Sequence, residues 1–253
     1  MIVPDVQINH ATLSYQGKYL FNQLSLPLGS GQWVGLLGPS GVGKTSLLRL
    51  IAGLTLPNEA SSSTITTSNQ LPIQQQIAYM PQADSLLPWL SVLDNAALGL
   101  ALRPAAAPNR LLQKKQAHQL LHQVGLGASG HLYPGQLSGG MRQRVALIRT
   151  LLENKPIILM DEPFSAVDAI TRYQLQTLAA TLLKGKTVLF ITHDPAEALR
   201  LANVIYLMQG HPATLTAVTT LSSQTPRELS DPDIAPLQAH LQKALFMAKE
   251  AST

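Results

Sequence analysis

The stretch Gly38-Pro39-Ser40-Gly41-Val42-Gly43-Lys44-Thr45 matches the phosphate-binding pattern G-x-x-x-x-G-K-[ST] at every fixed position. An apolar run at 33–37 precedes it and a helical pattern from Ser46 to Ala52 follows, so it lies between a predicted strand and a predicted helix. Glycines let the backbone wrap closely around a polyphosphate, whose oxygens the loop N–H groups and the helix N-terminus can bind. The stretch therefore predicts a nucleotide site in which Lys44 reaches the β- and γ-phosphates and Thr45 binds Mg²⁺.

The composition is that of an ordinary globular protein. The chain has 253 residues, of which 45% are hydrophobic, enough for a substantial core in one domain with a subdomain. The net charge of +4 is small for a chain in which 13% of residues are charged, so we interpret it as favouring solubility and expect no nucleic-acid partner. With no cysteine, disulfides and thiolate metal sites are excluded.

The chain has no features of membrane insertion. Residues 1–5 lack the basic start and apolar core of a signal peptide, and no apolar run reaches the length of about eighteen residues typical of a membrane span. We therefore expect any membrane role to depend on a partner.

The N-terminal part predicts strands from Val6 to Ser14 and from Leu20 to Leu28. Tyr15 follows the first strand beside a turn, where its ring can stack on a base or be a half-buried residue at a strand end. Residues 57–69 are rich in Ser, Thr and Asn, which predicts an exposed loop or an irregular edge hairpin.

A short strand is predicted from Gln76 to Met80, with Gln82 just beyond its end. In open α/β sheets ligands bind at the carboxyl ends of the strands, where Gln82 would lie near a phosphate-bound metal or water. Taken alone, a glutamine just past a strand is more often an ordinary loop residue.

The pattern becomes helical from Leu86 to about Asn154, which predicts a helical insert interrupted at 103–108. We interpret Lys114, Lys115 and His118 as part of its solvated face. Near its end, Ser138-Gly139-Gly140 precedes a segment with helical apolar spacing, so it predicts a helix N-terminus and a second anion site.

The apolar run from Pro156 to Met160 predicts a buried parallel strand that ends in Asp161 and Glu162. Adjacent carboxylates repel each other and lose solvation when buried, which favours a cation nearby. We therefore assign Asp161 to the metal and Glu162 to polarising the attacking water.

The last third predicts further α/β structure. A helix with an apolar face of Leu175, Leu178 and Leu182 is followed by a buried strand at 187–191 and a last strand at 204–208. Asp194, Pro195 and Glu197 form an acidic variant of the capping box, which leaves the neighbouring His193 as either a ligand contact or a structural residue. Residues 214–220 are uninformative, and 233–248 predict a packing helix that could also bind a partner.

In this order the motifs resemble those of the ATP-binding subunits of ABC transporters, from about Tyr15 to Met208. The resemblance rests on the Walker A motif at 38–45, the Q-loop at Gln82, the signature Leu137-Ser138-Gly139-Gly140-Met141, Walker B at 157–161 with Glu162, the D-loop at 165–168 and the switch histidine His193. Met141 replaces the more common glutamine, a mild departure, because Ser138 and the glycine amides face the anion.

The family resemblance implies an α/β P-loop fold with a mainly parallel core sheet, an antiparallel edge and a helical subdomain. It implies one ABC ATPase domain over residues 1–253, with a core at about 1–82 and 155–215, a helical subdomain at about 83–154 and a helical tail at about 230–250. The chain ends too early for the regulatory domain of sugar-importer relatives, so we do not expect that form of regulation.

The resemblance also implies roles for individual residues. Glu162, His193, Lys44 and Gln82 would be catalytic, and Thr45, Gln82 and Asp161 would hold Mg²⁺. Tyr15 would stack on the adenine. ATP would be bound by Tyr15, Gly38, Pro39, Ser40, Gly41, Val42, Gly43, Lys44, Thr45, Ser46, Ser138, Gly139 and Gly140.

Finally, the resemblance implies partners. In this family the Walker A and signature motifs face different nucleotides across an antiparallel dimer, so two copies would form two composite sites. Separate transmembrane permease subunits would contact residues 83–98 at the cytoplasmic face of the inner membrane, with a solute-binding protein in an importer. Residues 86–95 are similar to those of importers of nitrate, sulfonates, taurine and thiamine precursors. An exporter or lipoprotein-release ATPase and a soluble, non-transport ABC ATPase are the alternatives.

Overall fold

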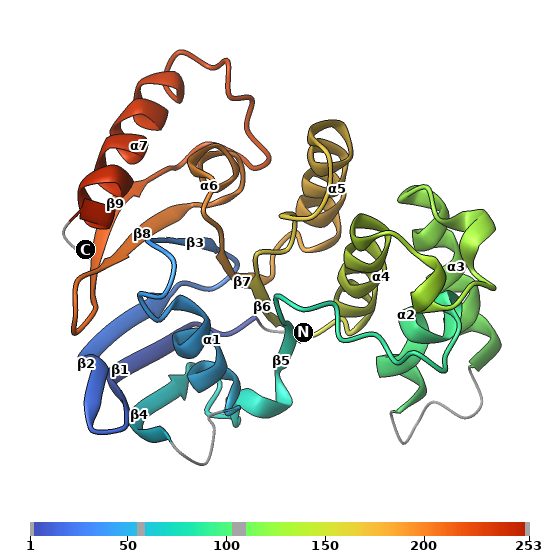
Figure 1. Cartoon of the computed structure of the whole chain (residues 1–253), viewed down its shortest axis with the longest axis horizontal. Helices are drawn as coiled ribbons and strands as arrows, with labels where there is room; N and C mark the ends of the chain where they lie inside the picture. The colour runs from blue at the N-terminus through green and yellow to red at the C-terminus, as the bar shows by residue number, and fades with distance from the viewer. Residues whose placement is uncertain (1–2, 55–58, 103–109, 251–253) are drawn as a thin grey trace. The chain divides into compact units, whose positions relative to one another are not determined.

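The computed structural model describes residues 3–54, 59–102 and 110–250 and divides into two compact units. The first unit comprises Met1–Ile77, Pro156–Glu162 and Lys184–Thr253, and the second comprises Ala78–Lys155 and Pro163–Leu183 (Figure 1). The domain limits expected from the sequence stay a prediction.

One sheet of the first unit is antiparallel. Its strands are β1 (Val6–Tyr15), β2 (Lys18–Leu28) and β4 (Glu59–Thr67), in the order β2-β1-β4. The expectation of a loop or hairpin at 57–69 is wrong for residues 59–67, which form a single edge strand on β1; residues 57–58 lie outside the described part. Backbone hydrogen bonding to β1, with Ile8 paired to Ile65, stabilises the extended conformation of β4, which its polar side chains do not indicate.

The larger sheet is mainly parallel. In the first unit its strands follow the order β6-β7-β3-β8-β9, and all neighbours are parallel except the antiparallel pair β8 and β9. The strands are β3 (Trp33–Leu37), β6 (Ile157–Asp161), β7 (Thr187–Ile191), β8 (Val204–Gln209) and β9 (Thr214–Thr220). Every residue of β3, β6 and β7 is buried, as their apolar sequences predicted.

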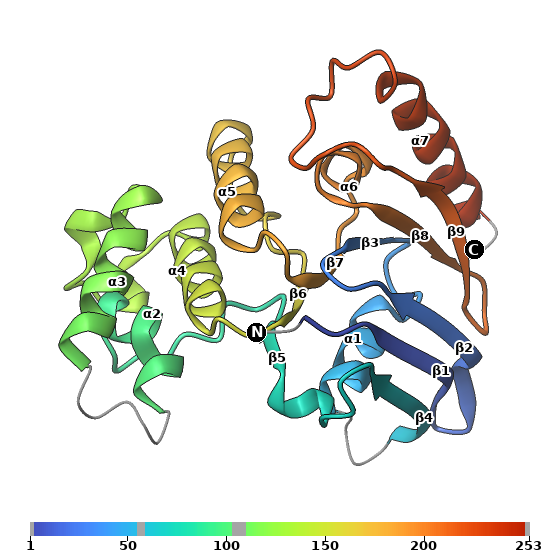
Figure 2. The same ribbon diagram turned by 180° about the vertical axis from the view of Figure 1, so that it is seen from behind.

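Helices of the first unit cover this sheet. Helix α1 (Lys44–Ala52) contacts β6, and α6 (Pro195–Leu201) contacts β3 (Figure 2). Asp194 caps α6 as predicted, but its carboxylate accepts from the N–H of Ala196 at 2.9 Å. A short 3-10 helix, η1 (Ile73–Gln75), precedes β5.

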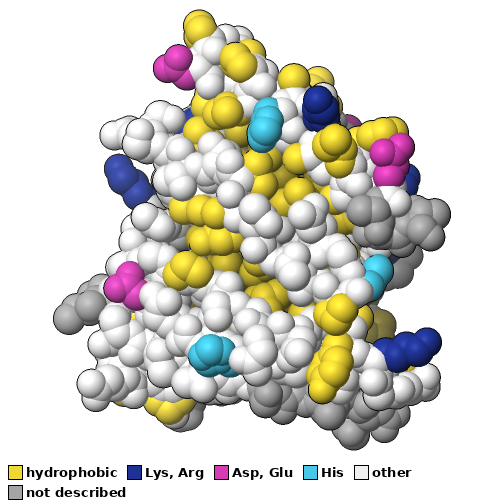
Figure 3. All heavy atoms as spheres, turned by 90° about the vertical axis from the view of Figure 1, so that its left-hand side faces the viewer, with side chains coloured by type: hydrophobic (Ala, Val, Ile, Leu, Met, Phe, Trp, Pro, Cys, Tyr) yellow, Lys and Arg dark blue, Asp and Glu magenta, His cyan; other side chains and the backbone are white. Residues whose placement is uncertain are grey.

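The predicted C-terminal helix is α7 (Ala235–Glu250), which contacts α6 and β8. Leu241 and Ala248 are buried, whereas Phe246 and Met247 are exposed. Figure 3 views this side of the molecule and shows apolar side chains in its middle with scattered charged groups.

The second unit is mainly helical and includes most of β5 (Ile77–Met80). Its helices are α2 (Val92–Ala101), α3 (Arg110–Gln123), α4 (Gly139–Leu152) and α5 (Ala169–Leu182), with 3-10 turns η3 (Gly127–Ser129) and η4 (Pro134–Gln136). Helices α2, α3 and α4 contact one another, and α4 contacts α5. The predicted interruption at 103–108 lies outside the described residues.

Side chains cap three of these helices. Ser91, Ser138 and Asp168 accept hydrogen bonds from the N–H groups of Asp94, Met141 and Thr171. Ser138 is therefore the N-cap of α4, at the helix start that the sequence predicted. On α5 the buried residues include Leu175 and Ala179, whereas Leu182 is the last residue of the helix and is exposed.

Candidate functional site

The phosphate loop connects β3 to α1 through a backbone that needs glycine. Gly38, Gly41 and Gly43 have φ angles of 156°, 81° and 109°, which residues with a side chain rarely adopt. A Cβ atom on Gly38 would also collide with the carbonyl oxygen of Met208 on β8. The loop is thus fixed both by its own conformation and by its packing on the neighbouring strand.

The loop wraps around the side chain of Lys44. Its ammonium group donates to the carbonyl oxygens of Gly38 at 2.8 Å and Pro39 at 2.7 Å. Burial lowers the pKa of Lys44, and the negative charges of Glu162 and Asp161 oppose that shift. A partly desolvated cation within the loop is suited to bind phosphate oxygens.

Thr45 and Asp161 meet beside this lysine. The Thr45 hydroxyl donates to Oδ2 of Asp161 at 2.7 Å, which joins the first turn of α1 to the end of β6. Burial raises the pKa of Asp161, and the Thr45 hydrogen bond acts against that shift. A hydroxyl and a buried carboxylate are the oxygen ligands that Mg²⁺ prefers, so these residues fit a magnesium ion held next to phosphates.

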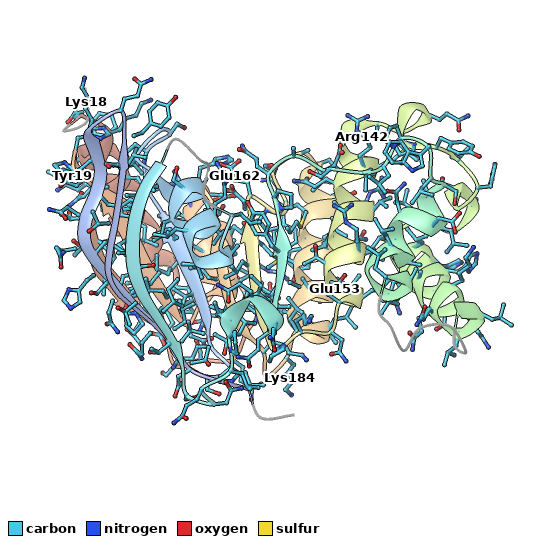
Figure 4. All side chains as sticks on the ribbon, turned by 90° about the horizontal axis from the view of Figure 1, so that it is seen from below. Lys18, Tyr19, Arg142, Glu153, Glu162 and Lys184 are labelled. Atoms are coloured by element: carbon cyan, nitrogen blue, oxygen red, sulfur yellow. The ribbon has the colours of Figure 1, made fainter. Side chains whose placement is uncertain are left out.

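Glu162 and His193 form a pair at the ends of β6 and β7. Nδ1 of His193 lies 3.5 Å from Oε1 of Glu162, and the side chains are 66% and 21% exposed. Glu162 has a φ of 48°, in the left-handed region, and its N–H donates to the carbonyl of Ile191 at 3.0 Å. Figure 4 labels Glu162 among the side chains of this site. A strained backbone that holds a carboxylate beside an imidazole is typical of a catalytic position.

The first unit thus brings together most of the predicted site. Lys44, Thr45, Asp161, Glu162 and His193 lie at adjacent strand ends and the loop, as expected for the carboxyl edge of a parallel sheet. Ser46 continues α1 from Thr45. Tyr15 ends β1 with its side chain 43% exposed, and its role in stacking stays a prediction.

Gln82 and the signature belong to the second unit. Ser138 uses its hydroxyl oxygen to accept from Met141 N–H at 3.3 Å. A Cβ atom on Gly140 would lie 2.9 Å from the carbonyl oxygen of Ala166, so this glycine is needed for close packing. The roles of Gln82, Ser138, Gly139 and Gly140 at a nucleotide stay predictions.

Sequence reasoning missed two connections of the second unit. Arg142 Nε donates to Asp84 Oδ2 at 2.8 Å, and Arg149 donates to the carbonyls of Asp84 and Ser85. Gln143 bonds to Ser165 and Ala166. Gln143 had a detectable signal, because it precedes the buried Leu147 by four residues and is a polar group on an apolar helix face.

The fold and the loop that encloses Lys44 define a P-loop nucleoside triphosphatase. Residues 21–165, more than half of the chain, match the family described as "ABC transporter". An uncharacterized ABC transporter ATP-binding protein of Haemophilus influenzae is 42% identical, over 95% of this chain and 98% of its own length.

Named importer subunits are similar over nearly the whole length. The taurine import ATP-binding protein TauB of Escherichia coli is 37% identical, covering 97% of this chain and 99% of the relative. The aliphatic sulfonates import ATP-binding protein SsuB 2 of Pseudomonas syringae is 38% identical, covering 93% of this chain and 96% of the relative.

A solved structure shares the fold. The ATP-binding cassette MJ0796, in a dimeric post-hydrolysis state bound to ADP and Pi, has a TM-score of 0.75 and 29% identity, covering 86% of this chain and 99% of its own. The chain belongs to the ABC transporter family, as a subunit that binds ATP and couples its hydrolysis to transport. This confirms the α/β P-loop fold and the family expected from the motifs.

Proposed function

We propose that this subunit hydrolyses ATP at the loop around Lys44 and thereby drives import of a small solute through separate transmembrane subunits. The observation that carries the proposal is the grouping of Lys44, the Thr45–Asp161 hydrogen bond and the Glu162–His193 pair in one unit. Phosphoryl transfer to water needs positioning and charge stabilisation, and this grouping supplies both.

Each group has a distinct proposed task. Lys44 and the loop N–H groups bind the β- and γ-phosphates, while Thr45, Asp161 and Gln82 would hold Mg²⁺, which supplies charge neutralisation at the phosphate oxygens. Glu162 aligns the attacking water and accepts its proton. His193 contacts the γ-phosphate and keeps the Glu162 carboxylate oriented across their 3.5 Å separation.

We also propose that two copies form the active ATPase. The chain has one phosphate loop and one Ser138-Gly139-Gly140 helix start. The structure of MJ0796 is dimeric, and this likeness supports a dimer of the present chain. Ser138 of one copy would complete the site of the other, and Tyr15 would stack on the adenine.

The permease contact is proposed for the segment before α2. Asn95 is fully buried; its amide donates to the carbonyls of Leu87, Leu90 and Ser91 and accepts from Leu87 N–H. These bonds fix a loop whose Trp89 is 69% exposed. A rigid loop with an exposed tryptophan is suited to dock a partner, since buried tryptophans contribute much of the binding energy at interfaces.

Import of a sulfonate-like solute is supported by the relatives. TauB and SsuB 2 are named for taurine and aliphatic sulfonates, whose shared group is a sulfonate on carbon. Export, lipoprotein release and non-transport functions are not favoured by these names. No described helix is long and apolar enough to span a membrane. We place the subunit at the cytoplasmic face of the inner membrane, with a solute-binding protein delivering the solute.

The catalytic assignment is tested with Glu162→Gln. This change keeps the shape of the side chain but removes the proton acceptor, so turnover should fall about a hundredfold or more, given the 10²–10⁴-fold typical of general-base catalysis. ATP binding should persist, and the variant should form an ATP-dependent dimer in size-exclusion chromatography. Glu228→Gln, outside the proposed site, is the control. Near-normal turnover of Glu162→Gln would refute the role of Glu162, and a monomer with bound ATP would refute the composite sites.

Transport is tested with the natural partners. The tagged subunit, purified from membranes in mild detergent, should carry polytopic permease subunits with it. After reconstitution, a binding protein loaded with taurine or an alkanesulfonate should stimulate its ATPase, and Trp89→Ala should weaken that stimulation. Purification without any membrane partner would contradict a transport role.

A further inference from the structure

Helix α4 forms hydrogen bonds with the turn at residues 165–168, which follows Glu162 in the chain. Oε1 of Gln143 accepts from the N–H of Ala166 at 2.8 Å, and its Nε2 lies 3.2 Å from Oγ of Ser165. Gln143 is only 6% exposed, although both residues that it binds are exposed. A buried glutamine is therefore used to hold a short surface turn by its backbone and its hydroxyl.

A second contact holds the other side of the same peptide. The carbonyl oxygen of Ala166 lies against Gly140, so closely that a Cβ atom there would approach it to 2.9 Å. The N–H and the C=O of Ala166 are thus both fixed by α4, one by Gln143 and the other by Gly140. Because Gly140 is three residues before Gln143 on the helix, the two contacts come from adjacent turns of one rigid element.

We propose that Gln143 is a positioning residue that links the Ser138-Gly139-Gly140 helix start to the chain segment leading from Glu162. Three residues, Pro163 to Ser165, separate Glu162 from Ala166. In the dimer of the proposed function, on which this inference rests, binding of the helix start to one nucleotide would orient the turn after Glu162 in the same subunit. Loss of the Gln143 contacts would thereby disturb the turn that follows Glu162 and slow the chemical step.

The hydrogen bond itself can be tested without any nucleotide. Gln143→Met keeps the length of the side chain but cannot accept from Ala166, whereas Gln143→Glu keeps an acceptor oxygen. Hydrogen exchange at the Ala166 amide should be about threefold to tenfold faster in Gln143→Met, as expected for the loss of one net hydrogen bond, and close to wild type in Gln143→Glu. Equal exchange in all three proteins would overturn the structural premise.

The functional link is tested by steady-state ATPase assays. Gln143→Met should lower kcat about tenfold or more while KM for ATP stays within about twofold, because small misplacement affects the chemical step more than binding by the phosphate loop. Gln143→Glu should recover kcat to within about threefold of wild type, since it can still accept the Ala166 N–H. Gln176→Met, at another buried glutamine of the second unit, is the matched control for loss of a buried amide and should keep kcat.

The outcomes that would overturn the inference differ from the one that would overturn the proposed function. A kcat of Gln143→Met within about twofold of wild type would overturn it. Failure of Gln143→Glu to recover activity, or an equal loss in Gln176→Met, would reduce Gln143 to a stabilising residue. If the wild type itself does not hydrolyse ATP, the proposed function fails, while the exchange experiment still reports on the Gln143 bond.

Discussion

The Arg227 side chain makes five hydrogen bonds within the first unit, and its replacement makes a quantitative test of the structure. Its buried guanidinium donates to the carbonyls of Leu199 at 3.0 Å, Ala202 at 2.6 Å, Leu221 at 3.3 Å and Ser223 at 2.7 Å, and to the Ser223 hydroxyl at 2.7 Å. A guanidinium has five N–H donors, so all of them are used. Burial lowers the pKa of Arg227, which means that these hydrogen bonds must offset a cost of desolvation.

The expected loss follows from the acceptors left behind. Two of them, the carbonyls of Leu199 and Ala202 at the end of α6, are in buried hydrogen bonds with Arg227. Each buried acceptor left without its partner costs about 1–3 kcal/mol. Removing a desolvated charge returns part of this cost, so Arg227→Met should lower the free energy of unfolding by about 2–4 kcal/mol, a large share of the 5–15 kcal/mol of a typical domain.

Two variants separate charge from hydrogen bonding. Arg227→Lys keeps the charge but has three donors, so about half of the loss should remain. Arg49→Met is the control, because Arg49 donates in an exposed position to the carbonyl of Leu54 at 2.9 Å, and its loss should cost about 1 kcal/mol or less.

Urea unfolding followed by tryptophan fluorescence measures these changes. The chain has two tryptophans, so a Trp89→Phe background leaves Trp33 as the fluorescent reporter of the first unit. Trp33 is buried, and its ring centroid lies 5.8 Å from that of Phe190 in an edge-on arrangement. A loss below about 1 kcal/mol for Arg227→Met, or identical stability of Arg227→Lys and wild type, would refute the reasoning from unsatisfied acceptors.

Two further predictions concern the loop and the helical unit. Gly38→Ala should lower the free energy of unfolding by about 2–4 kcal/mol, because backbone strain at φ 156° adds to the collision of the new Cβ with Met208. Gly41 has φ 81° but open space where a Cβ would lie, so Gly41→Ala should lower it by only about 1–2 kcal/mol. Equal losses for the two variants in nucleotide-free urea titrations would contradict the packing of the loop. Hydrogen bonds from Lys114 and then from Ser91 lower the pKa of Asp94, so its carboxylate stabilises the fold above the unfolded pKa, and this stability is lost as the pH falls through the lower folded value. Because the pair is exposed, Asp94→Asn should cost less than about 1 kcal/mol at pH 7, and calorimetry should find no difference at a pH well below the ordinary aspartate value; a difference that persists there would exclude the ion pair as its cause.

The sequence by itself determined the central strands and most of the group of residues that we propose to be catalytic. The runs of β3, β6 and β7 are apolar throughout, and chemistry-bearing residues follow each of them. Because parallel strands end at the same edge, linear order was enough to predict that Lys44, Asp161 and Glu162 would meet, whereas the place of His193 in this group was predicted only from the family resemblance. Helix α4 could also be predicted from the sequence, since the small residues Ser138-Gly139-Gly140 at its start and the helical spacing of its apolar residues are local features.

The tertiary structure decided what depends on backbone pairing and distant acceptors. β4 is a strand because β1 pairs with it, although its Ser- and Thr-rich sequence indicated a loop. The sequence around Gln143, Arg227 and Asn95 does not indicate their roles. Those roles come from hydrogen bonds to carbonyl, amide and hydroxyl groups that only the folded chain places next to them. Hydrophobic periodicity predicts which side chains are buried, but it does not predict which backbone groups will form hydrogen bonds with a buried polar side chain.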